Sequence, residues 1–191
     1  MRIILKSLDP EGVSLRLRHR FRRRSYSVRG PNFMWHMDGY DKLKQFGFPI
    51  HGAIDGYSRR ILWLRVMPTN NNPRVIAGFY IQCMKQIKGI PRVLRGDQGT
   101  ENSTLACVQR FLRRHSTEDL SGTESFVYER SVSNQRIEAW WSFLRRSETG
   151  YWINFFKDMR DSGQFNDSNP LHLDCIRFSF IALIQEELTR V

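Results

Sequence analysis

Three acidic side chains stand where the fold of this sequence could gather them around a cation. Asp97 follows a short apolar run and has glycines close by on both sides, as expected of an acid at the end of a buried strand. Asp38 ends the apolar segment at 33–37, and Glu138 lies in the segment at 133–141, whose apolar spacing is helical. A single acid at a strand end is usually a turn residue, so the hypothesis depends on all three together.

Three carboxylates that met without a cation would repel one another, and their pKa values would rise. A divalent cation removes this conflict, and all-oxygen ligation with open positions suits Mg²⁺ or Mn²⁺. Two such ions about 4 Å apart can activate an attacking oxygen and stabilise a leaving oxygen in phosphodiester chemistry. The residues therefore predict a metal site formed by Asp38, Asp97 and Glu138.

The elements that must position these acids follow from apolar periodicity and turn signals. Three strands come first, and Asn72 and Pro73 then mark the start of a helix. We expect strands at 32–38, 50–55, 61–66, just before Asp97 and at 125–128, and helices at 73–88, 101–115, 134–146, 151–163 and from Pro170 onward.

This order predicts an α/β fold with a mixed five-stranded sheet, helices on both faces and extra C-terminal helices. The acids converge only if the first and fourth strands are neighbours. Glu138 is expected at the edge of a core face made of Ile137, Trp140, Trp141 and Leu144. For the helix at 101–115 we expect Thr100 or Asn102 as the cap and an apolar face of Leu105, Val108, Phe111 and Leu112.

The charge balance indicates a polyanionic partner. The 191 residues, 40% of them hydrophobic, suffice for one domain with a core, and 30 Lys and Arg against 19 Asp and Glu give a net charge of +11. A basic segment at 1–31 is expected to be an arm or linker that tracks a phosphate backbone. A solvated linker or a nuclear-targeting patch are the alternatives. The DNA-binding candidates in this arm are Arg20, Arg22, Arg23 and Arg24.

The sequence gives little support for a disulfide-rich, zinc-binding, secreted or membrane protein. Its three cysteines are far apart and form no C-x-x-C pair, so a disulfide framework or a cysteine-based zinc site is not expected. We find no signal peptide and no stretch long enough to cross a membrane. His36 lies two residues before Asp38, where a packed or hydrogen-bonded role is commoner than ligation.

Three local patterns resemble the integrase catalytic core of retroviruses and retrotransposons, a branch of the DDE superfamily. They are residues 54–59 (IDGYSR), 96–102 (GDQGTEN) and 134–138 (NQRIE), in matching order over about residues 30–165. The likeness is greatest to transposon-derived integrase-core proteins of eukaryotic genomes. We therefore divide the chain into the arm at 1–31 and a catalytic core with a C-terminal helical extension at 32–191.

The resemblance implies a ribonuclease-H-like fold and an acid triad that holds two Mg²⁺ or Mn²⁺ ions. It also implies DNA 3′-end processing by hydrolysis, followed by strand transfer. Asn134 and Gln135 match the polar turn before the glutamate and are implied to lie near the DNA end, and Arg145 lies further along the same stripe of that helix. Asp55 matches a recurrent hairpin acid, for which we favour a structural role in the turn.

The sequence also departs from the family pattern. Gln98 stands where asparagine is common, and the gap of 41 residues from Asp97 to Glu138 (138 − 97) is longer than in retroviral integrases. Neither the zinc-binding amino-terminal domain nor the small β-barrel domain of those proteins is recognisable. We therefore expect either a fragment or a domesticated remnant.

The favoured hypothesis is a metal-dependent polynucleotidyl transferase that acts on DNA in the nucleus, with no membrane association. Joining two DNA ends to one target implies a homo-oligomer, a dimer or higher. A catalytically silent DNA-binding or scaffold protein is one alternative, and a ribonuclease-H-like nuclease is another.

Overall fold

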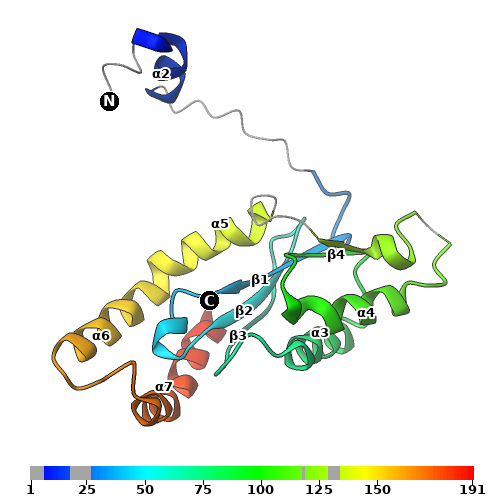
Figure 1. The fold of residues 1–191 in the computed structure, drawn as a ribbon. Helices are drawn as coiled ribbons and strands as arrows, with labels where there is room; N and C mark the ends of the chain where they lie inside the picture. The colour runs from blue at the N-terminus through cyan, green and yellow to red at the C-terminus, as the bar shows by residue number, and fades with distance from the viewer. Residues whose placement is uncertain (1–6, 18–26, 118, 129–133) are drawn as a thin grey trace.

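A mixed sheet of five strands forms the centre of the computed structural model, which describes residues 7–17, 27–117, 119–128 and 134–191 (Figure 1). The strands run in the order β3-β2-β1-β4-β5. The first three are antiparallel to one another, whereas β4 is parallel to both β1 and β5. The predicted ribonuclease-H-like α/β sheet is confirmed. The strands are β1 (Met34–Tyr40), β2 (Ile50–Asp55), β3 (Ile61–Val66), β4 (Val93–Gly96) and β5 (Phe126–Tyr128).

The first and fourth strands are neighbours, as the convergence of the acids requires. Met34 pairs with Val93, and His36 pairs with Arg95. The predicted bounds of the first strand, 32–38, are wrong at both ends, because β1 runs from Met34 to Tyr40. β1 pairs with β4 only as far as His36, and its pairing with β2 continues to Tyr40 and extends the strand.

Two helices begin where asparagine and proline stand together. The side chain of Asn72 accepts a hydrogen bond from the backbone N–H of Arg74 (3.1 Å), and that of Asn169 accepts one from Leu171 (3.0 Å). The α-helices are α2 (Pro10–Leu17), α3 (Pro73–Ile87), α4 (Ser103–Leu112), α5 (Gln135–Leu144), α6 (Gly150–Asp161) and α7 (Pro170–Arg190). The short helices are η1 (Lys44–Phe46), η2 (Thr100–Asn102), η3 (Gly122–Ser125) and the π-helix η5 (Arg145–Thr149).

The two faces of the sheet carry separate hydrophobic cores. Figure 1 shows the helices that lie on each side of the sheet. On one face α3 and α4 cover Trp35 and Met37, which are two residues apart in β1 and so point to the same side of the sheet. On the other face α5, α6 and α7 pack over Tyr40 and a cluster of aromatic side chains. Since successive side chains of a strand point to opposite faces, Asp38 shares its face with Tyr40 and so faces α5.

A π-helix joins α5 to α6, where the sequence predicted a break. The five residues Arg145–Thr149 bridge the two helices, which follow each other in one line in Figure 1. A Cβ atom at Gly150 would lie 2.6 Å from the carbonyl oxygen of Arg145, so only glycine fits there. Thr149 is buried and forms a hydrogen bond with the hydroxyl of Tyr40 (2.9 Å), which ties the π-helix to β1.

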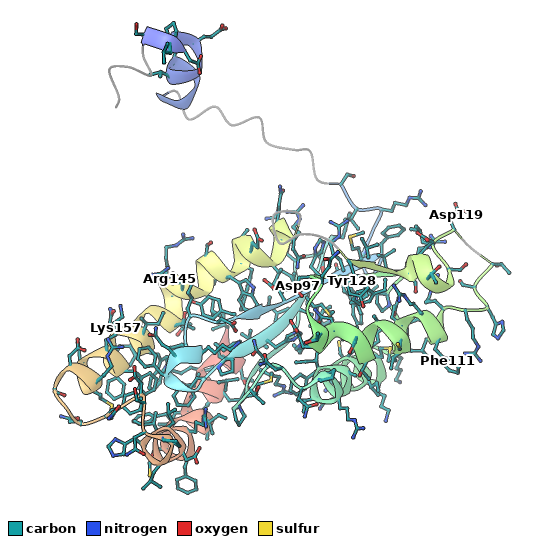
Figure 2. The ribbon with its side chains drawn as sticks, viewed as in Figure 1. Asp97, Phe111, Asp119, Tyr128, Arg145 and Lys157 are labelled. Carbon is teal, nitrogen blue, oxygen red and sulfur yellow. The ribbon has the colours of Figure 1, made fainter. Side chains whose placement is uncertain are left out.

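The predicted apolar face of α4 was partly wrong. Phe111 is 59% exposed and lies on the outer side of the helix (Figure 2), and Leu112 is also exposed. The helix instead buries Gln109, whose amide N–H donates to the carbonyl oxygens of Pro91 (3.1 Å) and Ser125 (3.3 Å). These two bonds set the rotation of α4, because a buried amide must keep its partners.

The outer edge of β3 is covered by a side chain of α7. Gln185 donates from its amide to the carbonyl oxygen of Leu64 (3.1 Å) and accepts from the backbone N–H of Val66 (3.1 Å). The amide therefore takes the place that a residue of a sixth strand would occupy.

The arm is described in part. The helix α2 lies within it, whereas Arg20, Arg22, Arg23 and Arg24 lie outside the described residues, so their predicted role stays a prediction. Among the described helices, none combines the length and the apolar character that crossing a bilayer requires.

Candidate active site

Asp38 lies in β1, and Asp97 directly follows the last residue of the adjacent strand β4. The last residue pair between β1 and β4 is His36 with Arg95, and each aspartate comes two residues later. A step of two residues within a strand keeps a side chain on its face, so the carboxylate of Asp38 lies on the side that α5 covers. Figure 2 shows Asp97 at the end of the central strands, between α5 and α4.

Glu138 lies in the first turn of α5, above that same face. Its side chain is half-buried, and its backbone N–H donates to the carbonyl oxygen of Asn134 (3.2 Å). Three residues later on the helix, the indole N–H of Trp141 donates to Oδ2 of Asp38 (3.0 Å). The helix that carries the third acid is thus bonded directly to the first acid.

Burial raises the pKa of Asp38 to about 6 from its ordinary value of 3.8. Repulsion from Asp97 adds to the rise, and repulsion from Glu138 adds less. Hydrogen bonds from Trp141 and from the backbone of Gly39 oppose it. The carboxylate of Asp38 therefore lies near enough to Asp97 and Glu138 to be affected by their negative charge.

Asp97 is held by the loop that follows its strand. The side chain of Asn102 donates to Oδ1 of Asp97 (2.7 Å), and the backbone N–H of Gly99 donates to the same oxygen (3.2 Å). Asn102 was expected to be able to cap the next helix. It does occupy the cap position, but its side chain makes no capping bond and turns to the aspartate. The asparagine thus orients a candidate ligand.

Asn134 is buried and fastens the start of α5 to β1. Its side-chain oxygen lies 2.7 Å from Nδ1 of His36, and its amide N–H donates to the carbonyl oxygen of Met37 (2.9 Å). Only 3% of the residue is exposed, and its predicted place near a DNA end stays a prediction. Burial lowers the pKa of His36 to about 4, and the nearby charges of Arg95 and Arg136 lower it further. His36 is therefore neutral at pH 7 and structural.

The family model described as integrase core domain matches residues 25–191. The chain belongs to this family. A comparison with curated proteins finds no match for it. The family is one of polynucleotidyl transferases, and the paired strand ends with an acid-bearing helix above them agree with an integrase core.

The other candidate residues of this integrase core fall into two groups. Gln135 and Arg145 are both exposed, and Figure 2 shows Arg145 on the outer side of the α5–η5 helix, so both remain DNA-binding predictions. Asp55 is 2% exposed, and its two carboxylate oxygens accept bonds from the backbone N–H of Asn32 (2.8 Å) and from both the backbone and the hydroxyl of Ser58. Its predicted structural role in the turn is confirmed.

The three acids of this integrase core offer the type of ligand atom that a hard divalent cation prefers. Aspartate and glutamate supply oxygen ligands, and the pKa of Asp38 is raised mainly by burial and further by the negative charges of Asp97 and Glu138, which a cation would neutralise. Within the described part of the chain, both hydrogen bonds to the carboxylate of Asp97 go to Oδ1. The described residues contain no group of three His, Cys, Asp or Glu side chains already close enough to hold a metal ion. The triad is thus oriented by its neighbours but not preassembled.

Sequence reasoning missed Trp141, Asn102 and Asn134 as residues that orient the site. Trp141 was assigned to the core face of its helix, which is where the structure places it, with 7% of its surface exposed. A usable signal was present, because a tryptophan three residues after Glu138 lies on the same side of the helix as that acid. A buried indole N–H also needs an acceptor.

Proposed function

We propose that this integrase core is a metal-dependent polynucleotidyl transferase that processes DNA 3′ ends and transfers them to a target strand. The observation that carries the proposal is the placement of Asp38 in β1 and of Asp97 just after the adjacent strand β4, below the helix that bears Glu138. Membership of the integrase core domain family supports it.

In this proposal Asp38, Asp97 and Glu138 hold Mg²⁺ or Mn²⁺, with two ions per site. Such ions activate an attacking oxygen and stabilise a leaving oxygen of a phosphodiester. The chain itself orients the ligands, since Trp141 fixes one oxygen of Asp38 and Asn102 fixes one of Asp97. The partner is DNA, and the net charge of +11 favours its backbone. Action on two DNA ends implies at least a dimer, and action on chromosomal DNA implies a nuclear location.

The test is an assay on labelled DNA duplexes with Mg²⁺ or Mn²⁺, comparing the wild-type protein with Glu138→Gln and Asp97→Asn. We expect nicked or joined products from the wild type only. A matched control is Glu148→Gln, which removes an acid of the same kind from η5 and should leave product formation unchanged.

The product sizes decide between reactions. Joined strands indicate a transferase, whereas shortened strands alone indicate a ribonuclease-H-like nuclease. If the wild type binds duplex DNA but yields no product with either cation, the proposal of catalysis fails and a DNA-binding or scaffold role replaces it. That outcome would agree with a triad that is not preassembled in the structure.

A further inference from the structure

Trp141 is a buried tryptophan whose only polar side-chain atom, the indole nitrogen, is bonded to a candidate metal ligand. Its indole N–H donates to Oδ2 of Asp38 over 3.0 Å, and the two residues are 103 positions apart in the chain. An indole nitrogen can donate but not accept, so the direction of this bond is fixed. A bond to an ionised carboxylate is stronger than one between neutral groups.

The indole ring is held by its neighbours. Tyr40 lies against it with a centroid distance of 5.2 Å, and Trp140 meets it edge to face, also at 5.2 Å. Below it, Gly52 of β2 leaves the space that the ring occupies, because a Cβ atom there would come within 2.9 Å of Cη2 of Trp141. A ring packed in this way has little rotamer freedom, so its N–H points to one place.

We propose that Trp141 is a positioning residue of the active site: its indole N–H fixes Oδ2 of Asp38 and so sets which way the carboxylate faces the cation and Glu138. The inference rests on the proposed function, because it assigns a task within that site. Glu138 and Trp141 are three residues apart and lie on one side of α5. The bond therefore links the ligand on the sheet to the ligand on the helix.

Asp97 is held in a comparable way. Asn102 and the backbone of Gly99 both donate to Oδ1. Each aspartate thus has an oxygen that is fixed by a donor of the protein. Partners that orient metal ligands in this manner commonly change metal affinity or activity by about 10- to 100-fold when they are removed. A purely structural tryptophan would satisfy its N–H without any effect on the cation, and this difference can be measured.

The experiment compares Trp141→Phe with the control Trp140→Phe, which removes the same atoms from the preceding residue of the helix and keeps an aromatic ring against Trp141. Mn²⁺ binding is measured by isothermal titration calorimetry, and kcat and KM are measured on a labelled duplex. We expect Trp141→Phe to weaken Mn²⁺ binding about tenfold or more and to lower kcat, with KM for the duplex unchanged. We expect Trp140→Phe to match the wild type.

A second measurement needs no substitution at Trp141. In an ¹H–¹⁵N spectrum of the wild type, one of five indole resonances belongs to Trp141. It should move when Mg²⁺ is added, and this movement should be absent in Asp38→Asn. The inference is overturned if the Trp141 resonance ignores Mg²⁺ while Mn²⁺ binds, or if Trp141→Phe and Trp140→Phe bind Mn²⁺ equally.

The readouts separate this inference from the proposed function. A wild type that forms no product but binds Mn²⁺, with weaker binding in Trp141→Phe, supports the positioning role and overturns only the catalytic proposal. A wild type that forms products, together with a fully active Trp141→Phe, overturns only the positioning role. A wild type that binds no divalent cation and forms no product overturns both.

Discussion

His36 and Asn134 form a hydrogen bond of 2.7 Å in the buried space between β1 and the start of α5, although 98 residues separate them in the chain. Because the amide of Asn134 donates to the carbonyl oxygen of Met37 at the same time, its oxygen faces the ring of His36. A single asparagine therefore joins the strand of Asp38 to the helix of Glu138.

Replacing Asn134 with alanine should lower the free energy of unfolding by about 1–3 kcal/mol, since it removes two buried hydrogen bonds at once. Urea unfolding followed by circular dichroism measures this change. The control is Gln135→Ala, which alters the neighbouring exposed residue and should stay within about 0.5 kcal/mol of the wild type. Equal stability of the two variants would show that the fastening by Asn134 is unimportant.

Stability should fall as the pH is lowered from about 6.5 to 4. Burial lowers the pKa of His36 and of His51 to about 4 in the folded protein, so the unfolded chain binds more protons in this window. Asp38 acts in the opposite direction, because its pKa is raised to about 6 and its folded form takes up a proton first. Urea midpoints at several pH values test this, and the fall should be steeper in Asp38→Asn, which lacks the opposing group. A flat profile would contradict the neutral state of both histidines.

Gly52→Ala should destabilise the fold by about 1–3 kcal/mol, because its new Cβ atom would clash with the ring of Trp141 and lie 3.3 Å from the carbonyl oxygen of Trp63. Thermal unfolding measures the loss. Gly78→Ala is the control, since Gly78 lies exposed in α3 with open space around its Cβ position and should gain about 0.5–1 kcal/mol. A neutral Gly52→Ala would mean that the ring of Trp141 can move aside.

Cation binding should weaken as the pH falls below about 6, if the acids hold a metal as proposed. Asp38 has a pKa of about 6, so protons compete with the cation for it from that pH downward. Calorimetric titration with Mn²⁺ at pH 7.5 and pH 5.5 should show the difference. In Asp38→Asn binding should be weak at both values, and an unchanged affinity in the wild type would exclude Asp38 as a ligand.

Replacing Arg20, Arg22, Arg23 and Arg24 with alanine should weaken DNA binding without regard to sequence and flatten its salt dependence. Fluorescence anisotropy of a labelled duplex over a range of salt concentrations gives the slope. A control that removes four exposed basic residues elsewhere keeps the change in net charge the same; it replaces Arg74, Lys85, Lys88 and Arg190. Equal salt dependence of DNA binding in the two variants would indicate that the arm is a linker and does not contact the phosphate backbone.

The sheet and most helix starts could be predicted because their signals are local. Asn72 with Pro73 and the apolar runs of the first three strands each act within a few residues. The rotation of α4 could not be predicted, since it depends on Gln109 meeting carbonyl groups 16 and 18 residues away. The π-helix joining α5 to α6 likewise depends on Thr149 meeting a strand residue 109 positions earlier.

In the candidate site, too, local signals allowed a prediction and long-range contacts did not. The three acids could be selected from type and context, and their placement then followed from one assumption about strand order, which the register of β1 and β4 confirms. The role of Asn134 could not be predicted, because its bonds to His36 and Met37 reach across 98 and 97 residues. Trp141 left a signal in its spacing from Glu138, but its bond partner Asp38 lies 103 residues away. The sequence resemblance instead implied that Asn134 lies near the DNA end.

The amide of Gln185 has a consequence for how this protein behaves at high concentration. An uncovered edge strand offers its backbone as a template on which another chain can add a strand, and this is a common start of aggregation. By occupying Leu64 and Val66, one glutamine of α7 blocks that template. The sheet should therefore not continue from one molecule to the next across β3.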